Sequence, residues 1–234
     1  MIASTRFVVI GAGGLGGPIA YALAAAGAGA ITVADPDRVE LSNLQRQVQF
    51  SGSDIGSPKV FALAGELCRR GYPAARVRAI DGAFAPESAA DILDGAGVVI
   101  DGSDDLATKF AANDAALARG IPVIVAGITR HAGHVLCARA GDGGCYRCLF
   151  EGPPDGDEPP TCADAGVLGA VCAVIGGEAA RAALALAAGN DACGITIYDD
   201  VTAPAPPRRH RISPRPGCPA CALAPHRGHQ RWAS

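Results

Sequence analysis

The chain has 234 residues, of which 49% are hydrophobic and 18% charged, and its net charge is −3. This length and composition suit one large domain, or a domain plus an appendage, with a sizeable core. A slightly acidic chain with no uninterrupted apolar run near the roughly 20 residues that span a bilayer is a poor match for nucleic acid or a membrane. No signal peptide precedes the first predicted strand, and nine cysteines fit a reducing compartment, so we expect a cytoplasmic protein.

The first predicted elements are a strand, a glycine-rich turn, a helix and a second strand. An apolar run over 6–10 is typical of a buried strand, an alanine-rich helix follows over 18–26, and a strand over 30–35 ends at Asp35. The turn between the first two has the spacing Gly-x-Gly-x-x-Gly at Gly11, Gly13 and Gly16. Glycines let the backbone approach phosphates, and helix N-termini offer free N–H groups. An acid at the end of the second strand, such as Asp35, suits ribose hydroxyls. The unit predicts a nucleotide site.

A polar connection follows the second strand and brings further charged residues to the predicted site. Arg46 lies within it and Lys59 just beyond it. Fixed cations such as these stabilise negative charge that develops on phosphate oxygens. The strand over 97–101 is followed by Asp104 and Asp105, whose carboxylates suit Mg²⁺ held jointly with phosphate oxygens. Surface salt bridges and helix caps are the alternative interpretation of these residues.

Strands and helices continue to alternate along the rest of the chain. The sequence predicts helices over 58–70, 86–93 and 106–119, strands over 75–80, 97–101, 121–126, 134–138 and 195–199, and one or two buried helices over 167–188. This alternation predicts an α/β, doubly wound, mostly parallel Rossmann-like sheet with its ligand at the carboxyl ends of the strands. Residues 202–216 are expected to be irregular, and 224–234 to form a flexible tail.

Four cysteines form two widely separated Cys-x-x-Cys pairs, at Cys145, Cys148, Cys218 and Cys221. Two such turns complete a tetrahedral zinc site, and four protein ligands leave no open position for catalysis. We therefore predict a structural zinc ion that attaches the C-terminal segment, with two disulfides or unrelated cysteines as alternatives. The cysteines outside these pairs and outside residues 151–166 are expected to be small buried residues: Cys68, Cys137, Cys172 and Cys193.

Several motifs together resemble the ThiF/MoeB/HesA family, the bacterial relatives of ubiquitin-activating enzymes. They are Gly-Ala-Gly-Gly-Leu-Gly from residue 11, Asp-Pro-Asp-Arg-Val-Glu-Leu-Ser-Asn-Leu-Gln-Arg-Gln from 35, Gly-Ser-Pro-Lys from 56, Asp-Gly-Ser-Asp from 101, Cys-Tyr-Arg-Cys-Leu-Phe from 145 and Cys-Pro-Ala-Cys from 218. The resemblance implies adenylation of the C-terminal Gly-Gly carboxylate of a small ubiquitin-like sulfur carrier, with ATP and Mg²⁺. It also implies a homodimer and one structural zinc ion per subunit. The acyl-adenylate would then pass to a sulfur nucleophile, either Cys162 or a separate sulfur donor.

The resemblance assigns roles residue by residue. It implies a nucleotide-binding set of Gly11, Gly13, Gly14, Asp35, Asp37, Ser42, Asn43, Arg46, Gln47, Lys59, Asp104 and Asp105. Arg46, Lys59 and Asp104 take the catalytic roles, and Cys162, in a crossover loop over 151–166, matches a cysteine that joins sulfur chemistry in some members. One adenylyltransferase domain then covers 1–223, with the zinc-binding segment at 202–221.

Two departures from the family pattern stand out. Family members usually carry an N-terminal helical extension whose arginine reaches the neighbouring subunit's ATP, and Arg6 does not match it. Asp105 stands where an asparagine is usual. Two other functions remain open at this point. An NAD(P)- or FAD-binding oxidoreductase would use the glycine turn but leave Arg46 and Lys59 idle, and a non-catalytic module of the same fold would retain only carrier binding.

Overall fold

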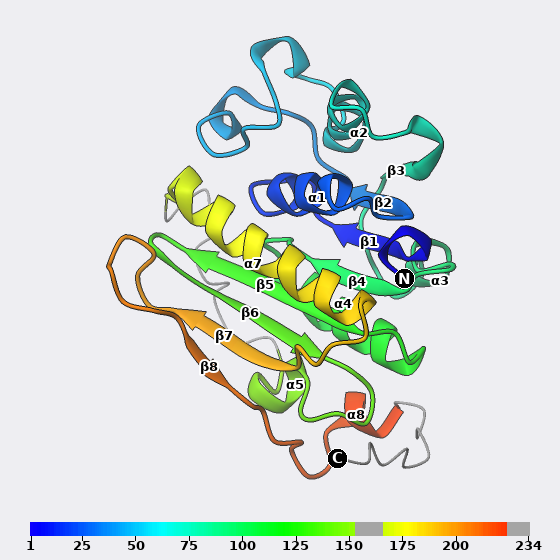
Figure 1. Cartoon of the computed structure of the whole chain (residues 1–234), viewed down its shortest axis with the longest axis vertical. Coiled ribbons are helices and arrows are strands. Elements are labelled where there is room, and N and C mark those ends of the chain that lie inside the picture. The colour runs from blue at the N-terminus through cyan, green and yellow to red at the C-terminus, as the bar shows by residue number, and fades with distance from the viewer. Residues whose placement is uncertain (153–165, 224–234) are drawn as a thin grey trace.

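The computed structural model describes residues 1–152 and 166–223. Within this part, eight strands form one sheet in the order β3-β2-β1-β4-β5-β6-β7-β8 (Figure 1). The strands are β1 (Arg6–Ile10), β2 (Ala30–Asp35), β3 (Val77–Asp81), β4 (Val98–Asp101), β5 (Val123–Thr129), β6 (Ala132–Ala138), β7 (Gly194–Tyr198) and β8 (Arg208–His210). The helices are α1 (Gly16–Ala25), α2 (Lys59–Arg69), α3 (Ala89–Ile92), α4 (Leu106–Ala118), α5 (Tyr146–Leu149), α7 (Gly169–Ala187) and α8 (Pro219–Leu223).

The sheet has a parallel half and an antiparallel half. Strands β3, β2, β1, β4 and β5 are parallel, whereas β6, β7 and β8 each run antiparallel to the strand before them. The chain leaves β1 toward β2 on one side and returns to β4 on the other. Ligands of open α/β sheets bind in the crevice outside the carboxyl ends of the strands at such a switch point. The Rossmann-like fold predicted from the sequence is confirmed.

Helices cover both faces of the sheet and bury two apolar clusters. One cluster lies beneath α1, α2 and α7, with Phe7, Leu23 and Ile175 among its fully buried side chains. The other lies beneath α3, α4, α5 and α8 and includes Val8 and Leu117. Because successive residues of a strand point to opposite faces, Phe7 and Val8 belong to different clusters. Figure 1 shows α1 and α7 on the viewer's side of the sheet and α4 behind it.

Helix α7 is a single element, where the sequence allowed one or two. It is long and apolar enough to cross a membrane by length and composition. Over half of it is buried in this fold, where it packs on α1 and β5, as a core helix does. Its stretch of 19 residues is interrupted by Glu178 and Arg181, which form an ion pair with each other.

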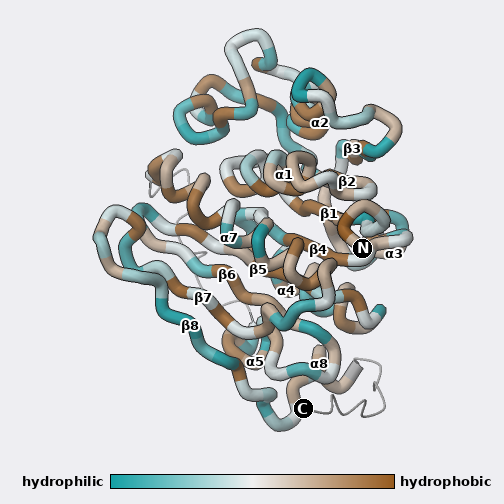
Figure 2. The backbone as a smooth tube through the Cα atoms, viewed as in Figure 1, coloured by the Kyte–Doolittle hydropathy of each residue, from teal (hydrophilic) through white to brown (hydrophobic). Residues whose placement is uncertain are grey.

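Strand β8 lies where the sequence predicts irregular chain. All three of its residues are exposed, and their backbone pairs with that of Ile195, Thr196 and Ile197. Figure 2 shows β8 as a hydrophilic segment at the edge of the sheet. Such a strand has no apolar alternation, so periodicity does not reveal it. The polar connection after β2 also contains two short 3₁₀ turns, η2 (Leu41–Asn43) and η3 (Gly52–Asp54).

Candidate nucleotide-binding cleft and four-cysteine site

The glycine turn between β1 and α1 forms one end of a large cleft. Gly11 has φ +89°, and a Cβ atom on Gly16 would lie 1.9 Å from the carbonyl oxygen of Gly11. Side chains at these positions would therefore push α1 away from β1. The Nε2 of Gln49 donates to the carbonyl oxygens of Ala12 and Gly13, at 2.9 and 2.8 Å. Gln49 therefore fixes the turn through these two hydrogen bonds, a role that no sequence motif indicates.

Asp35 stands at the end of β2 and is tied to the same turn. Its carboxylate accepts hydrogen bonds from the backbone N–H groups of Ala12, at 2.6 Å, and Asp37, at 2.7 Å. Burial raises the pKa of Asp35, although these two N–H groups and nearby Lys59 act in the opposite direction. The carboxylate still lines the cleft, so it combines a role in shaping the turn with a position suited to a ribose hydroxyl.

The cleft has a volume of about 950 Å³ and lies at the carboxyl ends of β1, β2 and β4. Most of the predicted nucleotide set lines it: Gly11, Gly13, Gly14, Asp35, Asp37, Asn43, Arg46, Gln47, Lys59, Asp104 and Asp105. Ser42 is exposed outside the lining, where its hydroxyl donates to Glu40 at 3.2 Å. Cys162 and the tail over 224–234 lie outside the described residues.

The two predicted phosphate-binding cations differ in their surroundings. The Nζ of Lys59 is nearly buried and lies 2.7 Å from a carboxylate oxygen of Asp37, which is itself largely exposed. Arg46 donates to the carbonyl oxygen of Ser42 at 3.2 Å and has no carboxylate partner among the described residues. The structure therefore presents one cation already fixed in place and a second that is free to meet an anion.

The acids that follow β4 have three different roles. Asp104 is exposed in the cleft and makes no hydrogen bond or ion pair within the described part of the chain. Asp105 caps α4 by accepting hydrogen bonds from the N–H and hydroxyl of Thr108, which outweigh the effect of burial and lower the pKa of Asp105. Asp101, the last residue of β4, is fully buried and does not line the cleft.

Lys109 explains why Asp101 is buried. Its ammonium donates to Asp101 at 2.9 Å and to the carbonyl oxygens of Ser103 and Ala126, at 2.6 and 2.7 Å. These three acceptors satisfy all three donors of a lysine, as a buried cation requires. Lys109 joins the β4–α4 loop to β5 beneath the cleft. The helical periodicity of the sequence could have indicated Lys109, because it is the one charged residue on the buried face of α4.

Beyond the nucleotide end, aromatic side chains from two elements line the cleft. Tyr146 is the first residue of α5 and Phe150 follows the last, and their ring centroids are 4.8 Å apart. The ring centroid of His134, on β6, lies 6.1 Å from that of Phe150. The Nε2 of His134 is buried without a hydrogen-bond partner among the described residues. Burial, with repulsion from Lys109, lowers the pKa of His134 to about 4, so its imidazole is neutral at pH 7. Tyr146 and Phe150 belong to the motif that begins at Cys145, but their place in the cleft was not expected from the sequence.

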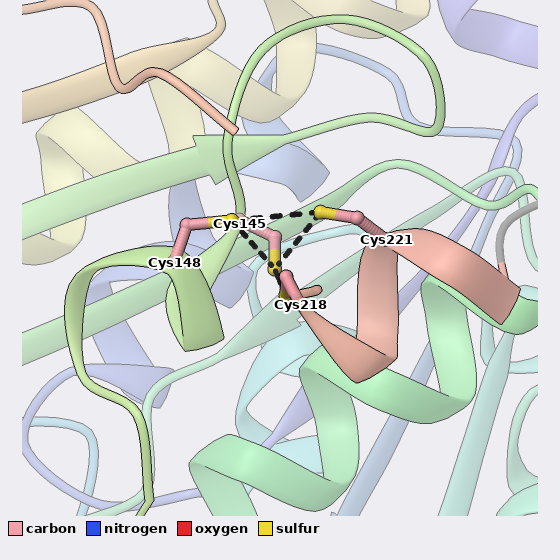
Figure 3. Close-up of side chains that lie close together, drawn as sticks. All are labelled: Cys145, Cys148, Cys218 and Cys221. Atoms are coloured by element: carbon pink, nitrogen blue, oxygen red, sulfur yellow. Dashed lines mark hydrogen bonds between the residues drawn. The ribbon is translucent and has the colours of Figure 1, made fainter. Parts of the chain in front are cut away.

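The four cysteines of the two predicted pairs come together at α5 and α8 (Figure 3). Four sulfur–sulfur distances lie between 3.6 and 3.9 Å. Tetrahedral zinc with bonds of about 2.3 Å separates its sulfur ligands by about 3.8 Å. The arrangement fits a zinc ion, and the four thiols are not joined in disulfides in this structure, because bonded sulfurs would lie about 2 Å apart.

Neighbouring residues hold and tune this four-cysteine site. The backbone N–H of Arg215 donates to the sulfur of Cys148 at 3.2 Å, and fully buried Asn113 of α4 accepts the N–H of Tyr146 and donates to Cys145. Burial raises the pKa of Cys145 to about 11. At Cys148 the same burial is outweighed by N–H donors, chiefly that of Arg215, and its pKa falls to about 7. Four clustered thiols lose their protons together only beside a cation.

Comparison with known proteins shows the family. A family model described as the ThiF family matches residues 1–220. The sulfur carrier protein adenylyltransferase of Thermus thermophilus is 38% identical over 226 residues, which cover 93% of this chain and 82% of that relative. The adenylyltransferase and sulfurtransferase MOCS3 of Sus scrofa is 37% identical over 96% of this chain, but this chain spans only 50% of it.

Solved structures show the same fold. The crystal structure of E. coli MccB with ATP has a TM-score of 0.77 and covers 94% of this chain and 68% of its own, at 20% sequence identity. At that identity the likeness concerns the fold alone. The names of the sequence relatives support the nucleotidyltransferase activity that the sequence predicts. With a family model across residues 1–220 and relatives near 38% identity, the chain belongs to the ThiF family.

Proposed function

We propose that this protein uses ATP to adenylate the C-terminal Gly-Gly carboxylate of a small ubiquitin-like sulfur carrier. The observation that carries the proposal is the single cleft that joins the glycine turn, Asp35, Arg46 and Lys59 and then continues toward α5. Relatives named as sulfur carrier protein adenylyltransferases support the substrate class. Thiocarboxylate formation for thiamine, molybdopterin or a related pathway is the use we expect for the product.

The nucleotide end of the cleft accounts for ATP binding. Gly11 and Gly13 let phosphates approach the backbone where α1 begins, and the free N–H groups of a helix N-terminus attract anions. Asp35 is placed for the ribose hydroxyls. A ribose contact serves the ground state and the transition state alike, so it contributes to binding more than to the chemical step.

The chemical step is an in-line displacement. A carboxylate oxygen of the carrier attacks the α-phosphorus of ATP, the bond to the bridging oxygen breaks, and pyrophosphate leaves. Negative charge grows on the phosphate oxygens, and Arg46 and Lys59 offset it from fixed positions. Exposed Asp104 and its neighbour Asp105 suit Mg²⁺, which would neutralise phosphate charge when bound. Lys59 begins in an ion pair with Asp37, which holds its ammonium in place before ATP arrives.

The aromatic end of the cleft is the proposed path of the carrier's C-terminal segment. An extended glycine-rich tail needs a narrow apolar passage with few side-chain pockets. Tyr146, Phe150 and neutral His134 line such a passage between the nucleotide end and β7. The four-cysteine site, which we propose binds structural zinc, holds α5 and therefore this wall.

The product acyl-adenylate must then meet a sulfur nucleophile. We propose either Cys162 or a separate sulfur donor for this step. Cys162→Ala should leave adenylation intact; undiminished thiocarboxylate formation by the variant excludes an obligatory role for this cysteine. A homodimer in the cytoplasm is part of the same proposal and rests on the family resemblance.

The test is ATP–pyrophosphate exchange with a purified ubiquitin-like carrier that ends in Gly-Gly. We expect exchange that requires Mg²⁺ and the carrier, and none when the carrier lacks its final glycine. No exchange with any sulfur carrier from the same genome would contradict catalysis and favour a non-catalytic carrier-binding module. Thermal shifts with ATP and with NAD separate the oxidoreductase alternative, because only a dehydrogenase site should be stabilised more by NAD.

A further inference from the structure

Two cysteines outside the four-cysteine site form a pair of their own. The sulfur of Cys137, on β6, lies 3.9 Å from the sulfur of Cys193, just before β7. Cys137 is buried, whereas Cys193 is partly exposed. Neither lines the nucleotide cleft, and neither has a role in the proposed adenylation. From the sequence, both are expected to be small buried residues, and the partial exposure of Cys193 does not fit that expectation.

A glycine places the two sulfurs on one side of the sheet. Cys137 is paired in register with Gly194, the first residue of β7. In a regular strand the residue before Gly194 would point to the opposite face. Gly194 has φ +126°, and a Cβ atom on it would lie 2.5 Å from the carbonyl oxygen of His210, so only glycine fits there. This backbone turn directs Cys193 toward Cys137, and both pack in the cluster beneath α7.

The charged groups around the pair are already matched. Asp142 forms an ion pair with Arg139, and Asp191 forms one with Arg211. Although Asp142, Asp191 and Cys193 lie close enough to hold a metal ion, each carboxylate already faces a guanidinium. A cation would have to displace both arginines. The surroundings therefore favour thiol chemistry over a second metal site.

The two thiols are not equivalent. Cys137 donates its proton toward Cys193. This hydrogen bond, with a smaller effect of Arg139, lowers the pKa of Cys193, although burial and the carboxylates of Asp142 and Asp191 act in the opposite direction. The same bond and burial raise the pKa of Cys137. Since the thiolate is the reactive form, Cys193 is the nucleophile of the pair and Cys137 the thiol behind it.

Cys193 is also the member that a reagent can reach. A small surface hollow of about 50 Å³ is lined by Cys193, Gly143, Gly144 and Arg211, among others. Two glycines in its wall leave the sulfur without bulky cover. Cys137 is buried and does not line the hollow.

We propose that Cys193 and Cys137 form a dithiol redox site that reacts with low-molecular-weight disulfides of the glutathione type. The Cys193 thiolate attacks one sulfur of the disulfide, which forms a mixed disulfide and releases one thiolate. Cys137, losing its proton to solvent, then attacks the Cys193 sulfur, forms the Cys137–Cys193 bond and releases the second thiolate. The two protein thiols are oxidised by two electrons, and the small disulfide is reduced to two thiols.

The internal disulfide would join β6 to the start of β7 across 56 residues of sequence. Closing a loop of this length stabilises a fold by restricting its unfolded chain. We expect oxidation to raise the melting temperature by about 5–10 °C, reversibly on addition of a thiol reductant.

The test is incubation of the full chain with glutathione disulfide, followed by non-reducing tryptic mass spectrometry. Cleavage places Cys137 on peptide 131–139 and Cys193 on peptide 182–208, each without another cysteine. We expect these two peptides to be cross-linked in the wild type. Cys137→Ser should retain one glutathionyl group on Cys193, and Cys193→Ser should leave Cys137 unmodified. Cys68→Ser is the matched control and should behave as the wild type.

Near-UV circular dichroism and zinc content, measured before and after oxidation, check that each variant is folded and that the four-cysteine site is intact. A wild type that keeps a stable glutathionyl adduct without a cross-link overturns the proposal. So does a folded wild type whose Cys193 reacts no faster than Cys68, or one in which the cross-link joins other cysteines. None of these outcomes depends on adenylation, so failure here leaves the proposed function untouched.

Discussion

In the cleft, Arg46 and Asp104 face open space with no charged partner in the described chain, whereas at α5 and α8 four cysteine sulfurs face one another. The first arrangement leaves groups free for a ligand that comes and goes. The second offers four protein ligands to a tetrahedral ion, which would leave no open position for a substrate. The two are connected, because Tyr146 follows the ligand Cys145 directly and lines the cleft. The four-cysteine site thus supports one wall of the nucleotide cleft.

The largest expected effect is at the four-cysteine site. The wild type should contain about one zinc ion per chain, and Cys218→Ser should lose it, whereas Cys68→Ser should keep it. Structural zinc contributes about 10–16 kcal/mol in small zinc peptides, so α5 and α8 should detach without it. The measurements are elemental analysis and near-UV circular dichroism, to which the buried Tyr146 contributes. A metal-free wild type that is fully folded would refute this half of the comparison.

A buried charge pair beneath the cleft should give the next largest effect. Lys109→Met leaves Asp101 buried without its cation, and loss of one partner of such a pair costs about 3–5 kcal/mol. Urea unfolding should show this decrease in the free energy of unfolding. The double variant Lys109→Met with Asp101→Asn removes the unpaired charge and should recover part of it. A loss below about 1 kcal/mol in the single variant would mean that water reaches Asp101.

The open groups of the cleft should affect catalysis rather than stability. Arg46→Ala and Lys59→Ala should each lower pyrophosphate exchange by about 10²–10³, the scale of one preorganised stabilising group. Arg38→Ala is the matched control, since this exposed arginine pairs with Asp81 at 3.9 Å and does not line the cleft. Equal exchange rates in all three variants would show that the cleft's cations do not meet phosphate.

The smallest expected effect concerns His134. Its pKa is lowered from 6.5 to about 4 in the folded protein, so the unfolded chain binds a proton first as the pH falls. The corresponding stability is complete above pH 6.5 and is lost as the pH falls toward 4. The shift sets an upper limit of about 3 kcal/mol, and partial exposure reduces this to about 1–2 kcal/mol. In the His134→Gln variant, the free energy of unfolding measured with urea should change less between pH 6.5 and 4 than in the wild type. The variant His210→Gln, at an exposed position, should behave as the wild type.

Local sequence signals were sufficient wherever a residue's role depends on its near neighbours. The strand, turn and helix around Gly11 and Gly16 follow from apolar runs and glycine spacing, and the paired cysteines from their two-residue separation. The alternation of elements predicted the doubly wound sheet. It did not predict the three antiparallel strands at its edge as a group, because β8 pairs through backbone atoms that carry no sequence pattern.

Roles that depend on contacts between distant segments could not be predicted in this way. Asp101 and Asp104 belong to one motif, yet burial against Lys109 removes the first from the cleft and leaves the second in it. The side chain of Gln49 bonds to the glycine turn across 37 residues of sequence. Phe150, which follows α5, lies beside His134 of β6.

By itself the sequence determined the family, the order of the elements, the glycine turn and the residue types at both sites, since these depend on spacing along the chain. The tertiary structure alone decided which charges are paired, which remain open, and that Cys193 meets Cys137 through the turn at Gly194. The physical reason is burial: whether an ionisable group keeps water, finds a counter-ion or meets another thiol is set by what folds against it.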